Sequence, residues 1–475
     1  MRGKDKGICA CIRCMLFIGM TVQILMGILW MAGNITAVQE FAESENSVIY
    51  PILLKGVQGI GKLLPVPYYT FMYVVQLVAA FLSGGKLLCA LGVIRRSTAE
   101  SRSKKIWYNL ALVTIPMLMQ CHLALLPDSP ALSAWLMFLA ELIGAVEAAG
   151  NTVESIKGKN LGINLGKACA WWIVAVLFLP EYIWYGAAVI IAFVLIYAGK
   201  FMCGKLLTWL LVPVLVTVCL LAGQRAFTGR TYGEITARTM VSRFSWPYFS
   251  QHFPAWSQEV WDAVGPRDAV AIDEYAENVE NAYFPVMEEF FGKKQAVRYY
   301  RELAELTFAI HTKEIVFRVS WDMFCCSAPP LGMELQLEGA GYESYTGRNY
   351  DIMMQNTPEL TVWYVRYSNW WFVVSVALQT VYSVLQWAGS ISQRSRSRRS
   401  GINQGNISLN SSISRRVAKG RAVGWFMLAG AAVMVIIAAL SGAGVMDYKK
   451  VIYVTLLWYL WILQGKGGGE DEICR

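Results

Sequence analysis

Residues 68–105 read YYTFMYVVQLVAAFLSGGKLLCALGVIRRSTAESRSKK, and this stretch decides the class of the fold. Its first 27 residues carry a single charge, at Lys86. A helix needs about 20 predominantly apolar residues to cross the bilayer core. The next eleven residues carry five Lys and Arg, and such cations gather on the cytoplasmic side of membranes. The stretch therefore predicts a transmembrane helix that ends in the cytoplasm.

The composition of the whole chain agrees with this reading. Of 475 residues, 56% are hydrophobic and 16% are charged, with a mean hydropathy of +0.41. Soluble globular proteins have about 45–50% apolar residues and about a quarter charged residues. These figures exclude an ordinary soluble enzyme and predict an all-α, polytopic membrane protein.

Ten apolar runs predict about ten transmembrane helices. They cover residues 15–33, 68–94, 106–126, 130–149, 161–179, 182–199, 206–223, 368–389, 423–443 and 446–463. No small-x-small cleavage site follows the first run, so we expect a retained helix and not a signal peptide. Pro180 and Glu181 interrupt residues 161–199, which we interpret as two spans joined by a tight outer turn.

The distribution of cations orients these spans in a plasma membrane. The N-terminal residues MRGKDK, the loop 95–105 and the segment 390–421 all fall on the cytoplasmic side. The segment 390–421 contains eight Lys and Arg and no carboxylate. Because Ser, Gly and Asn separate its arginines, we expect a flexible basic loop that lies against anionic head groups. The side of the C-terminal tail stays open.

Residues 224–366 differ in composition and form the predicted extracellular part, between an N-terminal membrane module (1–223) and a C-terminal one (367–475). They carry a net charge of about −6, while the rest of the chain carries about +15. No basic groove for nucleic acid is indicated. Apolar residues recur at helical spacing in 273–291 and 294–324, with a Gly-Lys-Lys turn at 292–294 between them. After Ala328-Pro329-Pro330 we expect a loop that caps the membrane part.

The candidate catalytic residues are carboxylates on two predicted outer loops. Glu40 and Glu43 lie on the first loop, and Asp128 lies on the second, LPDSP (126–130), which begins one turn after His122. A carboxylate at the membrane surface is often only a solvated polar end. The alternative is that one of these acids removes a proton from an acceptor hydroxyl as a general base.

A run of arginines follows the seventh predicted span, on the outer side, where cations are normally few. Its members are Arg225, Arg230, Arg238 and Arg243. Arginine donates paired hydrogen bonds to phosphate oxygens, which predicts a site for a lipid-linked phosphate. The alternative is pairing with Glu234 and neighbouring acids.

Three charges fall within predicted spans: Lys86, Glu141 and Glu147. Equal depth from the outer ends makes Lys86 and Glu147 possible partners, and snorkelling explains them equally well. Glu141 lies closer to the middle of the membrane and is the better functional candidate, although a hydrogen bond between helices is the ordinary explanation for such a residue.

Several stretches together resemble the membrane module of GT-C glycosyltransferases, including bacterial relatives of protein mannosyltransferases. They are YPILLKG (50–56), PVPYYTFMYVVQLVAAFL (65–82), TIPMLMQCHLALLPDS (114–129), FLPEYIWYG (178–186) and GVMDYKKVIYVTLLWYLW (444–461). The first outer loop differs from the family, because it offers AESEN (42–46) where the family has Asp followed by Glu or Tyr.

The resemblance implies transfer of a sugar from a polyprenyl-phosphate donor to a glycan, lipid or protein acceptor at the outer face. It implies that Glu43 or Glu40 is the base, that Asp128 assists or holds a divalent metal ion, and that the four arginines bind the donor phosphate. Two other readings stay open. A polysaccharide polymerase or ligase also has many spans, a large outer loop and outward arginines, but it needs no acid in the first outer loop. A transporter or envelope-assembly protein is the non-enzymatic alternative.

Overall fold

The computed structural model describes the chain in segments. These are residues 3–34, 47, 49–62, 68–91, 99–123, 126–150, 154–179, 182–183, 185–187, 189–190, 215–216, 218–219, 222–223, 234, 237–238, 240–245, 284–340, 358–399, 431–432, 435–436, 439 and 448–467. The chain forms two compact units: unit 1 comprises Met1–Leu220, Ser327–Met434 and Val445–Arg475, and unit 2 comprises Leu221–Cys326 and Val435–Gly444.

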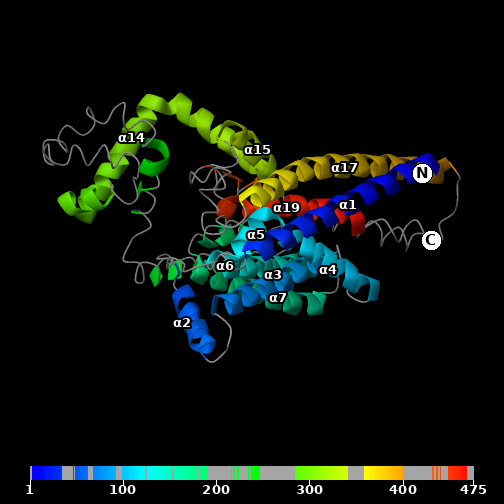
Figure 1. Ribbon diagram of the computed structural model, residues 1–475, viewed down its shortest axis with the longest axis horizontal. Helices are drawn as coiled ribbons and strands as arrows, with labels where there is room; N and C mark the ends of the chain where they lie inside the picture. The colour runs from blue at the N-terminus through cyan, green and yellow to red at the C-terminus, as the bar shows by residue number, and fades with distance from the viewer. Residues whose placement is uncertain are drawn as a thin grey trace. The chain divides into compact units, whose positions relative to one another are not determined.

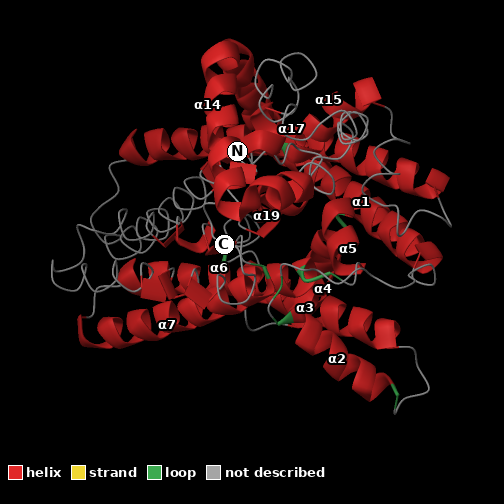
Figure 2. Ribbon diagram, turned by 90° about the vertical axis from the view of Figure 1, so that its left-hand side faces the viewer, coloured by secondary structure: helices red, strands yellow, loops and turns green. Residues whose placement is uncertain are grey.

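The elements of the described segments are helices, with no strand among them (Figure 2), so the predicted all-α class is confirmed for this part of the chain. Figure 1 labels the helices of unit 1. They are α1 (Gly3–Asn34), α2 (Tyr50–Gly61), α3 (Tyr68–Ala90), α4 (Ala99–Val113), α5 (Pro116–Leu123), α6 (Asp128–Gly150), α7 (Glu154–Phe178), α15 (Pro329–Ala340), α17 (Pro358–Arg399) and α19 (Tyr448–Gly467).

The most extensive helix packing in unit 1 joins α6 to α7 and α3 to α6. Trp135 on α6 and Trp172 on α7 are fully buried, and each reaches the segment that follows α7. The ring of Trp135 lies 5.3 Å from that of Tyr182, and Nε1 of Trp172 donates a 2.8 Å hydrogen bond to the carbonyl oxygen of Tyr182. Large aromatic side chains thus hold these three parts together.

The chain reverses direction just after α7. A methyl group placed on Gly186 would lie 2.0 Å from Nε1 of Trp172, so the two residues are in close contact. In one continuous helix, residues 14 positions apart would be separated by about 21 Å. The contact therefore requires the chain to reverse between Trp172 and Gly186. The predicted interruption at 180–181 falls within this stretch, and residues 180 and 181 themselves lie outside the described segments. The crossing of a membrane by both arms stays a prediction.

Helices α1 and α17 pack against each other as an antiparallel pair (Figure 1). Nε1 of Trp30 donates a 2.6 Å hydrogen bond to Oγ1 of Thr361 near one end of the pair. At the other end, the guanidinium of Arg13 donates to the hydroxyl of Tyr382 at 2.6 Å. Helix α19 packs against α17, and Ser368 and Tyr459 share a 3.3 Å hydrogen bond there.

The predicted span 106–126 is not one continuous helix, because it breaks between α4 and α5 at Thr114 and Ile115. Pro116 is the physical reason: it has no N–H to donate and its ring disfavours a helical conformation at the preceding residue. Ile115 N–H instead donates to Leu112 O at 3.2 Å, which leaves the neighbouring carbonyl groups to other partners.

Two expected loops are partly helical. Helix α17 continues to Arg399, so residues 390–399 of the predicted basic loop are helical. These ten residues contain Arg and Gln, which favour helices, and no Gly or Pro. The expected loop after Ala328 begins with α15, where Pro329 and Pro330 occupy the first turn and suit it because their nitrogens need no acceptor there.

Unit 2 is described mainly by the long helical element α14 (Phe284–Ser327, whose last residue belongs to unit 1) and the short π-helical turn η2 (Val241–Ser245). Gly292 interrupts α14 with φ 70°, a conformation that side chains rarely tolerate, so the predicted turn at 292–294 is confirmed. A second break at His311 was not predicted. Residues 273–283 lie outside the described segments.

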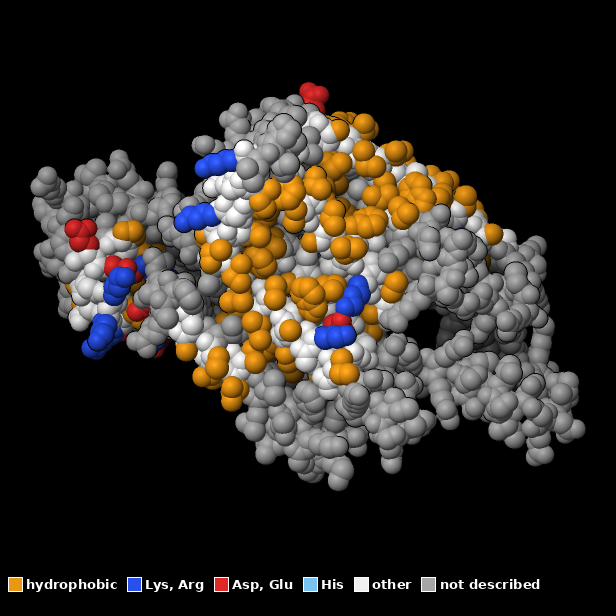
Figure 3. All heavy atoms as spheres, turned by 90° about the horizontal axis from the view of Figure 1, so that it is seen from below, with side chains coloured by type: hydrophobic (Ala, Val, Ile, Leu, Met, Phe, Trp, Pro, Cys, Tyr) orange, Lys and Arg blue, Asp and Glu red, His pale blue; other side chains and the backbone are white. Residues whose placement is uncertain are grey.

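Two described helical stretches, Gly7–Gly33 and Thr70–Ala90, are long and apolar enough to cross a membrane, as judged by length and composition. Both expose apolar side chains, for example Leu29 on α1 and Leu82 on α3. On the face drawn in Figure 3, described hydrophobic side chains form a broad area that contains few charges. Such an apolar surface suits contact with lipid.

Candidate functional site

The predicted site residues divide into those that the structure describes and those that it does not. Glu40, Glu43, Arg225 and Arg230 lie outside the described segments. Arg243 lies in η2, and its side chain is also outside the description. Four predicted residues have described side chains: His122, Asp128 and Glu141 in unit 1, and Arg238 in unit 2.

His122 and Asp128 come together where α5 ends and α6 begins, a place that we name the α5–α6 junction (residues 122–129). Nδ1 of His122 lies 2.9 Å from Oγ of Ser129. Asp128, His122 and Ser129 are only 5%, 2% and 0% exposed. Because the carboxylate is buried, Asp128 does not fit the description of a solvated polar end.

The local sequence explains this geometry. Pro127 lies just before α6, and its carbonyl oxygen accepts a 3.1 Å hydrogen bond from Ala131 N–H in the first turn. Asp128 belongs to that first turn, where the unpaired N–H groups of the helix favour a negative charge. His122 lies in the last turn of α5, so a short connection brings its ring back to Ser129.

The α5–α6 junction contains groups suited to proton transfer and to binding a cation or hydroxyl. A histidine held by a hydrogen bond to one ring nitrogen has a fixed orientation. A carboxylate can accept a proton or coordinate a hard metal ion. Among the described residues, however, no three His, Cys, Asp or Glu side chains gather as a metal-binding group. Ser129 was missed from the sequence, although its position directly after a Pro-Asp helix start is a usable signal.

Glu141 forms an ion pair with Lys86, across the packed helices α6 and α3. The side chain of Glu147 lies outside the described residues, so the alternative pair of Lys86 with Glu147 stays a prediction. The observed pair joins different positions along the two helices: Lys86 lies 18 residues after the first residue of α3, and Glu141 lies 13 residues after the first residue of α6. Glu141 thus has the interhelical contact that is the ordinary explanation for such a residue.

Arg238 forms an ion pair with Glu288 in unit 2. Its guanidinium carbon also lies 4.9 Å from the ring centroid of Phe284, a cation–π contact. Both charged side chains are largely buried, with 10% and 17% of their area exposed. The structure therefore gives Arg238 the carboxylate partner that the alternative interpretation expected, with Glu288 as the acid.

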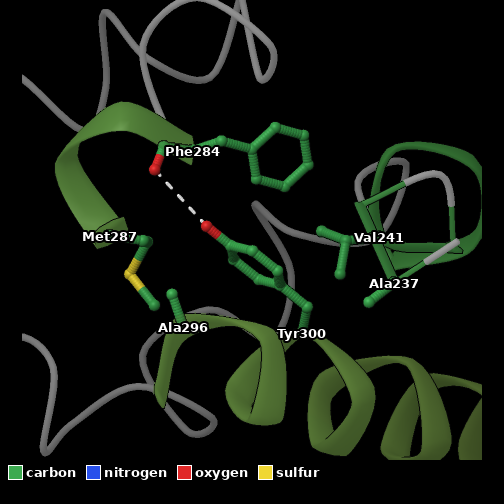
Figure 4. Packing of buried hydrophobic residues seen from close by; sticks show 6 residues of the cluster. All are labelled: Ala237, Val241, Phe284, Met287, Ala296 and Tyr300. Carbon is green, nitrogen blue, oxygen red and sulfur yellow. Dashed lines mark hydrogen bonds between the residues drawn. The ribbon is translucent and has the colours of Figure 1, made fainter. Parts of the chain in front are cut away.

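The surrounding core of unit 2 holds this ion pair in place. Figure 4 shows six buried residues of the cluster: Ala237, Val241, Phe284, Met287, Ala296 and Tyr300. The hydroxyl of Tyr300 donates a 3.4 Å hydrogen bond to the carbonyl oxygen of Phe284. The cluster joins the residues around η2 to both arms of α14 on either side of Gly292, which positions Glu288 next to Arg238.

A third polar feature lies at the break between α4 and α5. Ala111 O, left free there, accepts a 3.3 Å hydrogen bond from Nε2 of Gln23 on α1. Thr114 O accepts a hydrogen bond from the hydroxyl of Tyr364 on α17. The sequence gives Pro116 as a possible signal for this break, but it does not reveal the partners, which lie 88 and 250 residues away.

The comparisons with known proteins add no relative to this picture. No protein-family model, no characterised protein and no solved structure matches the chain.

Proposed function

We propose that this chain is a multi-pass plasma-membrane glycosyltransferase that transfers a sugar from a polyprenyl-phosphate donor at the outer face. The single observation that carries the proposal is the burial of Asp128 beside the His122–Ser129 pair. Burying a carboxylate is costly, so such residues are seldom left without a structural or chemical role. The GT-C resemblance gives this position the role of the second acid.

The proposed topology has about ten spans, with a cytoplasmic N-terminus and residues 224–366 outside. The apolar stretches Gly7–Gly33 and Thr70–Ala90 support membrane insertion. The distribution of Lys and Arg between the loops supports the orientation. In this topology the α5–α6 junction lies at the outer surface.

The proposed reaction inverts the configuration at the anomeric carbon of the sugar. Glu43 or Glu40 accepts the proton of the acceptor hydroxyl, whose oxygen forms the new bond to the anomeric carbon. The bond from that carbon to the phosphate oxygen breaks, and polyprenyl phosphate leaves with the electron pair. Asp128 assists, directly or through a divalent metal ion. Arginine side chains near the membrane stabilise the anionic leaving group.

The ion pair of Arg238 with Glu288 reduces the number of arginines that we propose as phosphate ligands. An arginine already neutralised by a buried carboxylate has less charge to offer a phosphate. Arg225, Arg230 and Arg243 therefore become the preferred phosphate ligands. Arg238 then has a positioning role within the core of unit 2.

The test is sugar transfer in membranes supplied with polyprenyl-phosphate sugars. Removing a general base typically lowers the rate by about 10²–10⁴-fold, so we expect losses of this order for Glu43→Gln or Glu40→Gln and for Asp128→Asn. Asp322→Asn is a matched control, because Asp322 is a similarly buried aspartate, 6% exposed, in unit 2. Normal transfer by all three site variants would refute the catalytic assignment.

A transporter is the second candidate, and the break between α4 and α5 favours it. Interrupted helices whose free carbonyl groups are satisfied by other helices are typical of transporters. The two candidates differ in product. A transporter moves the lipid-linked sugar across the bilayer of proteoliposomes with the sugar still attached, whereas a transferase releases polyprenyl phosphate.

A further inference from the structure

Helix α15 (Pro329–Ala340) belongs to the part of the chain that the sequence places outside the membrane, residues 224–366. In unit 1 it packs against α17 and α19, which both contain predicted spans (Figure 1). Its 12 residues extend about 18 Å, too short to cross a bilayer core of about 30 Å. A largely apolar helix of this length is either a core helix or a helix that enters a membrane and returns. The depth of its contacts distinguishes the two.

The pairing of α1 with α17 provides a depth scale for unit 1. Trp30 bonds Thr361 near one end of the pair, and Arg13 bonds Tyr382 near the other. Both α1 residues belong to the stretch of α1 that is long and apolar enough to cross a membrane. The part of α17 beside them, residues 361–382, extends about 32 Å, close to the thickness of a bilayer core. With a cytoplasmic N-terminus, Thr361 marks the outer end of this crossing.

Two hydrogen bonds hold α15 well below this outer end. Nδ2 of Asn369 on α17 donates a 3.1 Å hydrogen bond to Oε2 of Glu334 on α15. Asn369 lies eight residues inside the crossing, which is a depth of about 12 Å. Nε1 of Trp458 on α19 donates a 2.7 Å hydrogen bond to the carbonyl oxygen of Ser327, two residues before α15. The residue after Trp458 bonds Ser368 of α17, so this second contact lies at a similar depth.

The start of α15 suits a place inside the bilayer, where every backbone N–H needs an acceptor within the protein. The first four N–H groups of a helix have no partner within the helix. In α15 the first two of these positions are Pro329 and Pro330, which have no N–H. The next two, Leu331 and Gly332, both donate 2.9 Å hydrogen bonds to the carbonyl oxygen of Ala328. This helix start therefore leaves no N–H group without an acceptor.

We propose that α15 is a re-entrant helix, which enters the outer half of the bilayer from outside, packs on α17 and α19 about 12 Å deep, and presents Leu335 to the acyl chains of lipids. Leu335 is 40% exposed in the structure. The chain returns to the outer side, because α17 begins there. Glu334 is then a carboxylate within the membrane, where a hydrogen-bond donor such as Asn369 offsets part of the cost of burial. The proposal rests on the membrane topology of the proposed function, and it is independent of sugar transfer.

The experiment measures the depth of residue 335 in proteoliposomes. Leu335→Cys, in a cysteine-free background of the full chain, carries a nitroxide spin label. Electron paramagnetic resonance then compares its collisions with oxygen, which concentrates in the bilayer core, and with a water-soluble nickel chelate, which stays outside the core. We expect several-fold more frequent collisions with oxygen than with the nickel chelate.

Two control positions define the limits of this measurement. Val22→Cys on α1 is the matched membrane control, because Val22 is 36% exposed and lies eight residues from Trp30, again about 12 Å deep. Glu302→Cys is the aqueous control, since this side chain of unit 2 is 48% exposed. A label that favours the nickel chelate at 335 but oxygen at 22 would overturn the re-entrant helix and leave the membrane topology standing. A label that favours the nickel chelate at both positions would overturn the membrane insertion and the re-entrant helix together.

A second measurement uses the unmodified protein, in case the cysteine-free background does not fold. Lipids that carry a photoreactive diazirine in the middle of an acyl chain label only the protein surfaces that face the bilayer core. We expect labelling within residues 329–340, as within α1, and none within residues 298–305 of unit 2. Labelling of α1 without labelling of α15 would contradict the proposal.

Discussion

The contact between Gly186 and Trp172 gives the sharpest prediction, because it carries the chain reversal after α7. In Gly186→Ala the new methyl group would lie 2.0–2.4 Å from Nε1, Cδ1 and Cε2 of Trp172. The indole cannot move freely, since Trp172 is fully buried and its Nε1 donates to Tyr182 O. Either the segment after Leu179 moves away from α7 or the indole loses this hydrogen bond.

The expected cost combines three contributions. Overpacking in a buried region costs about 1–3 kcal/mol. Loss of a buried hydrogen bond costs about a further 1–3 kcal/mol. The higher helix propensity of alanine offsets about 1 kcal/mol of this destabilisation. The net expectation is a destabilisation of about 1–5 kcal/mol.

Gly166→Ala is the matched control, because Gly166 lies on α7 with no atom within 4 Å of the added methyl group. The control should be stabilised by about 0.5–1 kcal/mol, since alanine is the better helix former. Trp172→Phe should partly rescue Gly186→Ala, because the clashing atoms belong to the five-membered ring of the indole. Thermal unfolding of the wild type, the three single variants and the combined variant in detergent measures these differences, and the combined variant shows the coupling. An increase in melting temperature for Gly186→Ala similar to that of the control would refute the reasoning.

Three further predictions concern two ion pairs and the membrane topology. Glu141→Gln should destabilise the protein by about 1–2 kcal/mol. This is less than the 3–5 kcal/mol expected for breaking a fully buried pair, because the Lys86 side chain is 42% exposed. Adding Lys86→Gln should recover part of the lost stability, and additive losses in thermal unfolding would count against the pair. Arg238→Gln should lower the stability more, by about 3 kcal/mol, because Glu288 is left buried without its cation. Proteolysis of unit 2 should become faster, and an unchanged digestion pattern would contradict this. A cysteine introduced by Glu280→Cys in a cysteine-free background should react with an impermeant thiol reagent in intact cells, and labelling only after lysis would reverse the proposed topology.

Much of the helical architecture follows from hydrophobic runs and prolines. The run 130–149 predicts α6 to within two residues, and the predicted interruption at 180–181 falls within the reversal between Trp172 and Gly186. These features depend on neighbours in the sequence, so local patterns suffice to find them. The extension of α17 to Arg399 was missed, because the Ser, Gly and Asn residues between the arginines of 390–421 were interpreted as a loop, although residues 390–399 contain no Gly, Asn or Pro.

The partners of polar residues were harder to predict. Equal depth suggested Glu147 as a possible partner of Lys86, whereas the structure pairs Lys86 with Glu141. Helix offsets depend on how side chains interlock between helices, which a single sequence does not reveal. The same limit applies to Gln23 and Tyr364, whose partners at the α4–α5 break could be found only from the packed helices.

The pairing of α1 with α17 has a consequence for the synthesis of the protein. The hydrogen bonds at the two ends of this pair join residues 331 and 369 positions apart. At about 5–20 residues per second, α1 is made roughly 20–70 s before its partner leaves the ribosome. Throughout this interval Trp30 and Arg13 lack these hydrogen-bond partners, whereas Ala111, the partner of Gln23, is made only 88 residues after Gln23. A chain shortened before residue 361 would lack both hydrogen bonds, and α1 would keep only its packing against helices made early, such as α4 and α5.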